Sequence, residues 1–457
     1  MKKCEVLAID GGPKAFAKMT GKTRPKVGVE EFLSVAERFG FSPAALKRLK
    51  KAVSNKDLPE GGPHLGRYYG SAKPPMGERF ETLAKKKFRV KHALAVSSGT
   101  GALHAAFVGV GVGPGTEVIC PALGFAATAM AVVLSGGVPV FVDVDESLQI
   151  DPSKIEAAIT PRTVAVAPTH HWSNVADMGP VMAIARRHNL KVVEDCAQAP
   201  GAKYRGRYVG SIGDVGCYSI SSYKIIGGGE GGMVVTDDQR TFDRICQLAE
   251  GGGLWRNPRF GPPRYEGELF VGGNYRLSEL ESAVNLVQFG KVDDYCRRYR
   301  HISRRILRQL KNYKEITPQK INDREGYIGY MLRFYPAHCE LSAKIAKALT
   351  AEGIGAGSRG RDHHPDWHLY AYMFPIVLKT GAIPGGSVWE DPRYLQRGGQ
   401  VQYRRGQCPV AEDLYAREVA VSFSQWYSDQ DCDNIAAGIN KVLSAYYTEL
   451  PGKGVWL

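Results

Sequence analysis

A single lysine followed by a cluster of glycines stands in the stretch SSYKIIGGGEGG, residues 221–232. Glycines beside a lysine can form a loop that binds phosphate through backbone N–H groups. The amine of Lys224 can also act as a nucleophile toward a carbonyl carbon, provided that part of it is unprotonated. A surface lysine in a flexible loop is the third interpretation. Residues elsewhere in the chain distinguish the three.

A mononucleotide-binding loop needs the pattern GxxxxGK[ST], in which the lysine follows the glycines and opens a helix. At Lys224 the order is reversed, because the glycines come after the lysine. The GKT triplet at residues 21–23 has Phe16 where the first glycine is required. The glycine-rich stretch at 109–115 lacks GxGxxG spacing and is typical of a helix end followed by a turn. The sequence therefore excludes this kind of nucleotide site.

Small residues fill the turn between the apolar stretch HALAV and the helical stretch ALHAAF. The turn is SSGTG, with Ser98, Gly99, Thr100 and Gly101 as its last four residues. Hydroxyl groups and backbone N–H groups at a helix N-terminus bind phosphate well. An ordinary helix N-cap has the same composition, so the turn alone does not decide between the two.

Two further candidates come directly after predicted strands. Asp195 follows Glu194 at the end of the strand LKVVED, where α/β sheets bind ligands. A carboxylate buried there needs a cationic partner, and a protonated pyridine nitrogen would serve; an N-cap role is the alternative. Phe125 in PALGFAAT could stack on a planar cofactor or belong to the hydrophobic core.

A phosphate seat, a stacking ring, a carboxylate and a lysine, in that order, are the groups that pyridoxal phosphate requires. The lysine holds the aldehyde carbon as a Schiff base, and the carboxylate keeps the pyridine nitrogen protonated so that the ring withdraws electrons. The glycines after Lys224 permit tight turns close to a bound ring. The sequence therefore predicts a pyridoxal-phosphate enzyme in which Lys224 and Asp195 are catalytic.

The elements that must position these residues alternate between strands and helices over residues 80–250. Strands are predicted at HALAVSS, EVICPA, VPVFVDVD, TVAVAPTH, KVVEDCA and VGCYSI. Helical periodicity between several of them predicts a mostly parallel sheet with helices on both faces. We expect an α/β fold in three parts: an N-terminal helical segment (1–60), a large cofactor-binding domain (61–315) and a small α+β domain (316–457).

Composition limits the remaining classes of function. The chain has 457 residues, 44% hydrophobic and 23% charged, as in soluble globular proteins. No apolar run reaches the roughly 18–20 residues that span a bilayer, so we expect a cytoplasmic protein without a membrane partner. Nine cysteines without a CxxC pair argue against a zinc site or disulfide framework. The net charge of +14 indicates solvated helix faces or attraction of anionic small molecules; without a nucleic-acid motif, no nucleic-acid partner is predicted.

Four segments carry a resemblance to a known family: SSGTGALHAA, EDCAQAPGA, the lysine stretch with GEGG, and GGNYRLSELESAV. Together they resemble the DegT/DnrJ/EryC1/StrS aminotransferases, pyridoxal-phosphate enzymes of fold type I that aminate keto-sugars and cyclitols. The resemblance covers residues 60–310 and resumes at CPVAEDLYARE. It implies a homodimer with shared active sites and ping-pong transfer from L-glutamate or L-glutamine, with pyridoxamine phosphate as the intermediate.

The resemblance also implies roles for individual residues. Lys224 would carry the cofactor covalently and move protons, and Asp195 would pair with the pyridine nitrogen. Gln198 would contact the ring hydroxyl, and Phe125 would stack on the ring. The implied phosphate contacts are Thr100, Gly101, Ser219 and, from the neighbouring subunit, Asn274.

Three departures from the family pattern concern the substrate. Ser221 stands where relatives commonly have His or Gln, and THHWSN, with Trp172, replaces a VHLYG-type segment. The tract 358–406, with DHHPDWHLYAYMF, is unlike the short family pattern. Substrate contacts are expected near the lysine, in the THHWSN segment and at the dimer seam, from His170, Trp172, Ser221 and Arg276.

His363, His364 and His368 could be metal ligands, because HPDWH has the i, i+4 spacing of helical metal sites. Pro365 and the lack of a nearby carboxylate pair argue against this, so no metal is predicted and a substrate-facing loop is preferred. Two rival functions stay open: a sugar dehydratase of the same fold, which would have histidine in place of Lys224, and a non-catalytic regulatory protein. The acceptor also stays open between a nucleotide sugar, an octulosonate-type sugar and an inosose.

Overall fold

The computed structural model describes residues 6–21, 25–68, 73–361, 366–382, 385–452 and 456. The chain divides into two compact units, Met1–Lys73 and Pro74–Leu457. The predicted domain boundaries near residues 60 and 315 are not tested by this division and stay a prediction.

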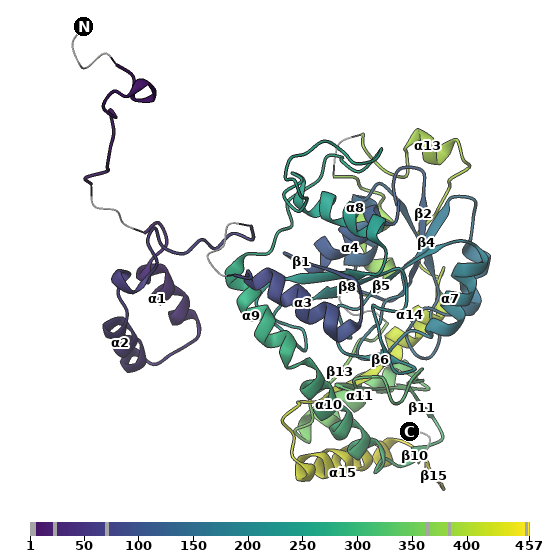
Figure 1. Ribbon diagram of the computed structural model, residues 1–457. Helices are drawn as coiled ribbons and strands as arrows, with labels where there is room; N and C mark the ends of the chain where they lie inside the picture. Colours follow the sequence, from purple (N-terminus) through teal and green to yellow (C-terminus); the bar gives the residue numbers. More distant parts are fainter. Residues whose placement is uncertain are drawn as a thin grey trace. The chain divides into compact units, whose positions relative to one another are not determined.

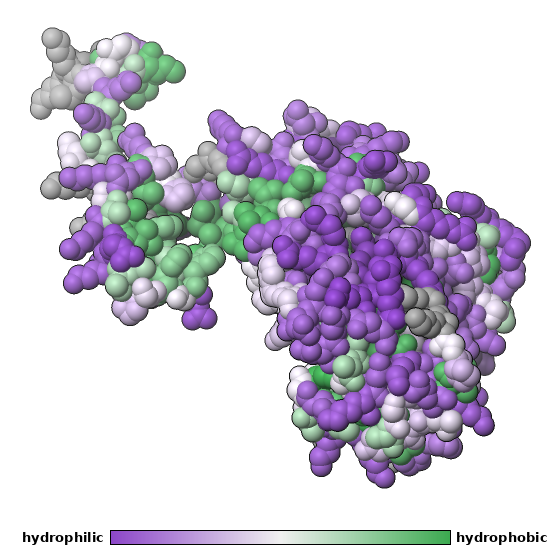
Figure 2. All heavy atoms as spheres, turned by 90° about the horizontal axis from the view of Figure 1, so that it is seen from below, coloured by the Kyte–Doolittle hydropathy of each residue, from purple (hydrophilic) through white to green (hydrophobic). Residues whose placement is uncertain are grey.

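The N-terminal unit contains two amphipathic helices, α1 (Val29–Arg38) and α2 (Pro43–Ala52), as the apolar periodicity predicts. In its described part, Ala36 is the one buried hydrophobic side chain. Figure 2 shows hydrophobic surface on this unit. The large exposed apolar side chains of the helical pair are Phe32, Phe39 and Phe41.

Seven strands in the described residues form the central sheet of the second unit, in the order β1-β9-β8-β5-β4-β2-β3. They are β1 (His92–Val96), β2 (Glu117–Pro121), β3 (Val138–Val142), β4 (Thr163–Val166), β5 (Lys191–Asp195), β8 (Val215–Ser219) and β9 (Gly232–Thr236). All pairs are parallel except the two that β9 makes. The six predicted strands are confirmed, and β9 is absent from the prediction.

Helices cover both faces of this sheet, as the alternation predicts (Figure 1). They are α3 (Met76–Phe88), α4 (Gly99–Gly109), α5 (Ala127–Leu134), α6 (Pro152–Ile155), α7 (Met178–Arg187), α8 (Gln239–Glu250) and α9 (Glu279–Gly290). Successive side chains of a strand face opposite sides. Leu94 and Val96 therefore join one core with α4, α5 and α8, whereas Ala93 and Ala95 join another with α3, α7 and α9.

A four-stranded antiparallel sheet, in the order β11-β12-β14-β13, lies in the C-terminal part of the same unit. Its elements are α10 (Val292–Leu307), β11 (Ile316–Pro318), β12 (Met331–Pro336), α11 (Cys339–Ala351), β13 (Ala356–Ser358), β14 (Val419–Ser422) and α15 (Asp429–Tyr446). The three helices share a separate hydrophobic core with the sheet. Figure 1 shows this part below the central sheet. The predicted fold class, an α/β domain with a smaller α+β domain, is confirmed.

The tract between residues 358 and 406 packs against the large sheet. The hydroxyl of Tyr403 donates to the carbonyl of Pro139 at 2.6 Å, and that of Tyr394 donates to the carboxylate of Glu117 at 3.1 Å. The short elements of the unit are β6 (Lys203–Tyr204), β7 (Arg207–Tyr208), β10 (Asn312–Tyr313), α12 (Phe374–Val377), α13 (Pro392–Leu395), α14 (Pro409–Arg417) and β15 (Glu449–Leu450).

Two composition-based predictions concern features of the whole chain. No helix in the described ranges is long and apolar enough to cross a membrane. Every cysteine that the structure describes is buried and free of disulfide bonds. Buried thiols act here as small hydrophobic side chains.

Candidate active site

Lys224 lies in the loop that joins β8 to β9. Its backbone N–H donates to the carbonyl of Ser221 at 2.9 Å, which closes a tight turn around the lysine. The N–H of Ile220 donates to the carbonyl of Gly231 at 2.9 Å and holds the two ends of the loop together. The loop therefore presents the lysine from a defined backbone rather than from a flexible one.

The glycines after the lysine are required by close packing. A side chain on Gly228 or Gly231 would overlap the amide of Asn285 on α9, and Gly229 has a φ of +117° that favours glycine. Asn285 is fully buried, and its Nδ2 donates to the carbonyl of Glu230 at 3.1 Å. Asn285 thus anchors the lysine loop, a role that no local sequence signal indicates.

Asp195 ends β5 and is buried at the carboxyl edge of the sheet. Thr128 donates its hydroxyl to Oδ2 at 2.6 Å, and the N–H of Ala197 donates to Oδ1 at 3.0 Å. Both donors are neutral, so this buried charge has no ion-pair partner within the described part of the chain. A buried carboxylate in this state can bind a cationic group of a ligand.

Lys224 is partly buried within electrostatic range of Asp195. Burial lowers the pKa of Lys224 below its ordinary value of 10.5, while the negative charge of Asp195 acts in the opposite direction. Desolvation disfavours the ammonium form. A larger fraction of Lys224 is therefore the neutral amine that attacks a carbonyl carbon.

The predicted phosphate seat forms where β1 leads into α4. The hydroxyl of Ser98 caps the helix by accepting the N–H of Gly101 at 3.0 Å. Gly99 packs against Ser219 at the end of β8, and a Cβ on Gly99 would lie 2.6 Å from the Cβ of Ser219. Thr100 is partly exposed beside them. The structure thus brings together residues more than one hundred positions apart at a helix N-terminus.

A cavity of about 630 Å³ opens beside Lys224. Small-molecule sites commonly measure about 300–1,000 Å³. Phe125 lines the cavity and is 46% exposed, although its neighbours on both sides are buried. Three more predicted residues line the same cavity: Trp172, Gln198 and Ser221.

Residues of the C-terminal part complete the cavity wall without having been predicted. Tyr299 on α10 donates its hydroxyl to the side-chain oxygen of Gln425 at 2.5 Å. The hydroxyl of Tyr330 donates to the carbonyl of Gln198 at 3.1 Å. Tyr299, Tyr330 and Gln425 line the cavity, but no local sequence signal separates these positions from other positions in the C-terminal part. His368, considered above as a metal ligand or part of a substrate-facing loop, also lines it.

His170 does not line the cavity, and its predicted substrate contact is corrected. The ring is fully buried; its Nδ1 accepts the N–H of Ala176 at 3.1 Å, and its Nε2 lies 3.0 Å from the carboxylate of Glu194. Glu194 also accepts the backbone N–H groups of Gly210, Ile212 and Gly213. Since both ring nitrogens are engaged, His170 is a structural residue.

One group of potential metal ligands occurs in the described residues: His170, Glu194 and Cys196. The hydrogen bonds given above already occupy the nitrogen atoms of His170 and both carboxylate oxygens of Glu194. Burial raises the pKa of Cys196 well above its ordinary value, so the thiol is protonated. We assign no metal to this group. His363 and His364 lie outside the described residues.

Asn274 and Arg276 lie in a segment whose backbone pairs with the end of β1. The N–H of Ser97 donates to the carbonyl of Tyr275 at 2.7 Å, and Arg276 bridges to Val96. Asn274 is exposed and Arg276 is partly exposed. Neither lines the cavity, so their predicted contacts stay predictions that involve a second subunit.

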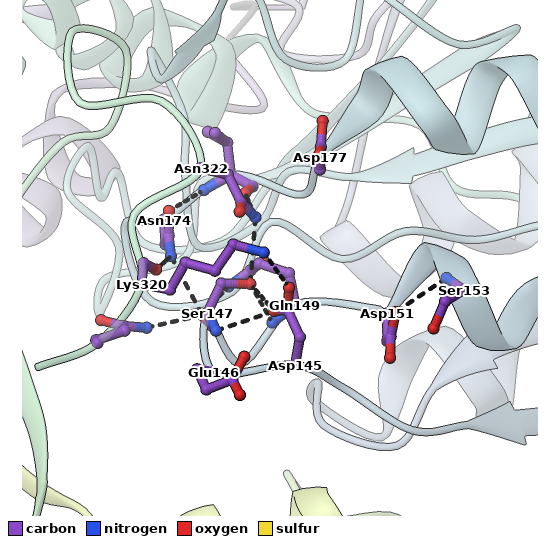
Figure 3. Close-up of polar contacts among 12 residues, drawn as sticks. Asp145, Glu146, Ser147, Gln149, Asp151, Ser153, Asn174, Asp177, Lys320 and Asn322 are labelled. Atoms are coloured by element: carbon purple, nitrogen blue, oxygen red, sulfur yellow. Dashed lines mark hydrogen bonds and ion pairs between the residues drawn. The ribbon is translucent and has the colours of Figure 1, made fainter. Parts of the chain in front are cut away.

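A polar network holds the loop after β4 in place (Figure 3). The side-chain amide of Gln149 accepts the N–H of His171 at 2.8 Å and donates to its carbonyl at 3.1 Å. Asn174 donates to the carbonyls of Ser147 and Lys320, at 3.2 and 2.9 Å. The loop is thereby tied to the large sheet and to the C-terminal part at once.

The basic residues of α10 line a surface groove of about 710 Å³. The guanidinium groups of Arg304 and Arg305 pair with Glu325 and Asp433, at 2.8 and 2.6 Å. None of the predicted cofactor or substrate residues lines this groove. It agrees with the interpretation of this basic stretch as a solvated helix face.

Comparisons with known proteins decide the family. The model of the DegT/DnrJ/EryC1/StrS aminotransferase family matches residues 72–371. The chain belongs to this family. It is a pyridoxal-phosphate-dependent aminotransferase, and the predicted resemblance and enzyme class are confirmed.

Several relatives of this aminotransferase have names. The L-glutamine:2-deoxy-scyllo-inosose aminotransferase of Streptoalloteichus tenebrarius is 40% identical over 78% of this chain and 82% of its own length. The spore coat polysaccharide biosynthesis protein SpsC of Bacillus subtilis is 32% identical over 81% and 90%. The GDP-perosamine synthase of Caulobacter vibrioides is 44% identical, but the match spans 45% of this chain and 54% of that protein.

Solved structures with the same fold include aminotransferases. An aminotransferase from Psychrobacter cryohalolentis is 25% identical, with a TM-score of 0.67 over 83% of this chain and 93% of the other. S. venezuelae DesV, solved in complex with a ketimine intermediate, is 27% identical, with a TM-score of 0.64 over 80% of this chain and 89% of the other.

Proposed function

We propose that this aminotransferase transfers an amino group from L-glutamate or L-glutamine to the ketone of a keto-sugar or keto-cyclitol, in a ping-pong reaction at Lys224. The observation that carries the proposal is the cavity that Lys224 and Phe125 line, with the buried carboxylate of Asp195 within electrostatic range of Lys224. The named relatives that act on an inosose or make perosamine support the acceptor class.

The residues present fit pyridoxal phosphate. The N-terminus of α4 with Ser98, Gly99, Thr100 and Gly101, together with Ser219, would hold the phosphate, because its N–H groups and hydroxyls suit a dianion. Phe125 projects from a buried segment and would stack on the ring. The remaining proposed contacts are Gln198 with the ring hydroxyl, Asp195 with the pyridine nitrogen and Asn274 of a neighbouring subunit with the phosphate.

Lys224 is proposed to bear the cofactor covalently and to move protons at its Nζ. When bound, pyridoxal phosphate supplies a carbonyl group and a conjugated ring that takes up the electron pair released from the donor's Cα. The neutral Nζ of Lys224, favoured by burial, can accept the Cα proton of the donor and then pass it to the cofactor. Asp195, held by Thr128 and Ala197, would stabilise positive charge on the ring nitrogen.

The acceptor site is proposed to include Trp172 and Ser221, which both line the cavity. Arg276 would hold the donor carboxylate from the seam of a homodimer with shared active sites. A cytoplasmic location completes the proposal.

The test is to reduce the cofactor-loaded protein with borohydride and locate the added mass by peptide mass spectrometry. We expect the mass on Lys224 and a visible absorption band that Lys224→Ala lacks, together with the loss of transamination. Lys441→Ala is the matched control, because Lys441 forms a surface ion pair with Glu352 and its side chain is 70% exposed. A Lys224→Ala protein that still transaminates would overturn the proposal.

A further inference from the structure

A second polar centre, the ring of His368, faces the same cavity as Lys224. The backbone around His368 is bonded to the loop that follows β2. The carbonyl of His368 accepts the N–H of Gly124 at 2.9 Å, and the carbonyl of Trp367 accepts the N–H of Ala126 at 2.9 Å. This pairing brings His368 beside Phe125, with the ring centroids 5.3 Å apart. His368 therefore belongs to the site although about 140 positions separate it from Lys224 in the chain.

One ring nitrogen of His368 is held by a carboxylate. Nδ1 lies 2.6 Å from Asp366, which also accepts the backbone N–H of His368 at 2.9 Å. Arg359 forms an ion pair with the same carboxylate at 2.5 Å. Burial raises the pKa of Asp366, but the hydrogen bonds that His368 donates to it outweigh this effect, so the pKa lies well below its ordinary value of 3.8. The ionised carboxylate fixes the proton on Nδ1.

Nε2 of His368 is thereby left as the group that can bind a ligand. No hydrogen bond to this nitrogen is present among the described residues. The ring is surrounded by other rings, with centroids 5.6 Å from His171 and 5.5 Å from Trp172. Such packing restricts ring rotation and points the nitrogen in one direction.

Trp172 forms the wall next to His368 in a strained backbone conformation. Trp172 and Ser173 have φ angles of +48° and +71°, which non-glycine residues rarely adopt. Strain of this kind costs on the order of 1–3 kcal/mol a residue and persists where the surroundings over-determine it. Here the side-chain amide of Gln149, labelled in Figure 3, accepts the N–H of the preceding residue, His171, and donates to its carbonyl. The guanidinium of Arg333 lies 3.4 Å from the centre of the indole.

We propose that His368 is a specificity-determining residue whose Nε2 accepts a hydrogen bond from a hydroxyl of the acceptor ring, with Trp172 forming the cavity wall beside it. The ligand class is a polyhydroxylated six-membered ring ketone, because such a ring offers hydroxyl donors at its rim and C–H groups on its faces. The inference rests on the proposed function and deepens it. Asp366 and Gln149 are positioning residues that act through His368 and Trp172.

The two halves of the ping-pong reaction separate this role from a structural one. The donor half-reaction is followed with L-glutamate by the change in the cofactor spectrum, and the acceptor half-reaction by adding 2-deoxy-scyllo-inosose to the amine form. In His368→Phe we expect kcat/KM for the acceptor to fall about 10- to 100-fold, the loss of one well-placed hydrogen bond. The donor half-reaction should change less than about twofold, and His368→Gln, which retains an acceptor oxygen, should recover part of the loss.

Asp366→Asn should weaken the acceptor step less than His368→Phe, and combining the two should add little, because both act on one hydrogen bond. Equal losses in both half-reactions of His368→Phe, or no loss in the acceptor step, would overturn the proposal. A wild-type protein that fails the donor half-reaction sinks the proposed function itself, and the present inference with it. Thermal unfolding of each variant checks that the fold is intact.

Discussion

Glu194 and Asp195 are consecutive buried carboxylates at the end of β5, yet they belong to different regions. Because successive side chains of a strand face opposite sides, Glu194 meets His170 and three backbone N–H groups of the turn at 210–213. Among the described residues, the carboxylate of Asp195 accepts hydrogen bonds from Thr128 and the N–H of Ala197, and it lies within electrostatic range of Lys224. A carboxylate saturated by donors stabilises its own fold. One with two neutral donors keeps charge to offer a cationic ligand.

The variant with the largest expected effect removes the charge of Asp195. We expect Asp195→Asn to lower kcat/KM for transamination by about 10²- to 10³-fold, the range for losing one preorganised electrostatic group. The free energy of unfolding, measured by urea titration, should change by less than about 1 kcal/mol, since the amide can still accept from Thr128. An Asp195→Asn protein with wild-type kinetics would contradict the difference in roles.

The matching change in the other region is Glu194→Gln. The amide places an NH₂ group among backbone N–H donors, so we expect a loss of about 3 kcal/mol in the free energy of unfolding. Activity per folded molecule should stay within about twofold, because the carboxylate of Glu194 is bound by His170 and the turn at 210–213, and neither of these lines the cavity. Glu352→Gln, in a surface pair with Lys441, is the control and should cost about 0–1 kcal/mol. A selective loss of activity without destabilisation would place Glu194 in the site instead.

A smaller effect is expected from Thr128→Val, which deletes the 2.6 Å bond to Asp195. Losing one hydrogen bond to a charged group costs about 1.5–3 kcal/mol, and here part of it should appear as a roughly tenfold lower kcat/KM. Thr350→Val is a control outside the site, because that hydroxyl bonds the carbonyl of Ala346 in its own helix. If both variants behave alike, Thr128 does not support Asp195 in the reaction.

The smallest effect concerns the titration of Lys224. Burial lowers its pKa and the charge of Asp195 raises it, so the neutral amine forms with a midpoint below 10.5 in the wild type. The rate at which apoenzyme combines with pyridoxal phosphate should rise with pH through that midpoint. In Asp195→Asn the midpoint should move lower still, because the opposing charge is gone. The same reaction with N-acetyl-lysine amide gives the pH dependence that comes from the cofactor alone. A higher midpoint in Asp195→Asn than in the wild type would contradict the prediction.

Much of the fold follows from local patterns. The six predicted strands are present because short apolar runs separated by helical stretches can only be buried in a sheet covered on both faces. The strand β9 is missed, although its residues pair with both β1 and β8. The strand begins at Gly232, the last glycine of the lysine loop. No separate turn marks its start, so the local pattern does not distinguish it from the loop.

Two residues of the loop after β4 show what local patterns do not predict, namely the surroundings of a side chain. His170 and Trp172 are two positions apart and were predicted to share a function, but His170 bonds Glu194 in the core while Trp172 reaches the cavity. The left-handed turn at Trp172 separates them, and it is imposed by Gln149 from another loop. Nothing within the segment THHWSN indicates that turn.

The sequence by itself determined the order of the chemical groups, the lysine with its glycines, and the strand ends at which a carboxylate and a phosphate seat had to lie. These features are local, because they depend on residue type and on the spacing of strands and helices. Only the tertiary structure decided which of two adjacent carboxylates lies within electrostatic range of Lys224 and which distant residues close the cavity. Tyr299, Tyr330 and His368 come from elements that pack against the large sheet, and contacts of such long sequence separation depend on packing rather than on any local periodicity.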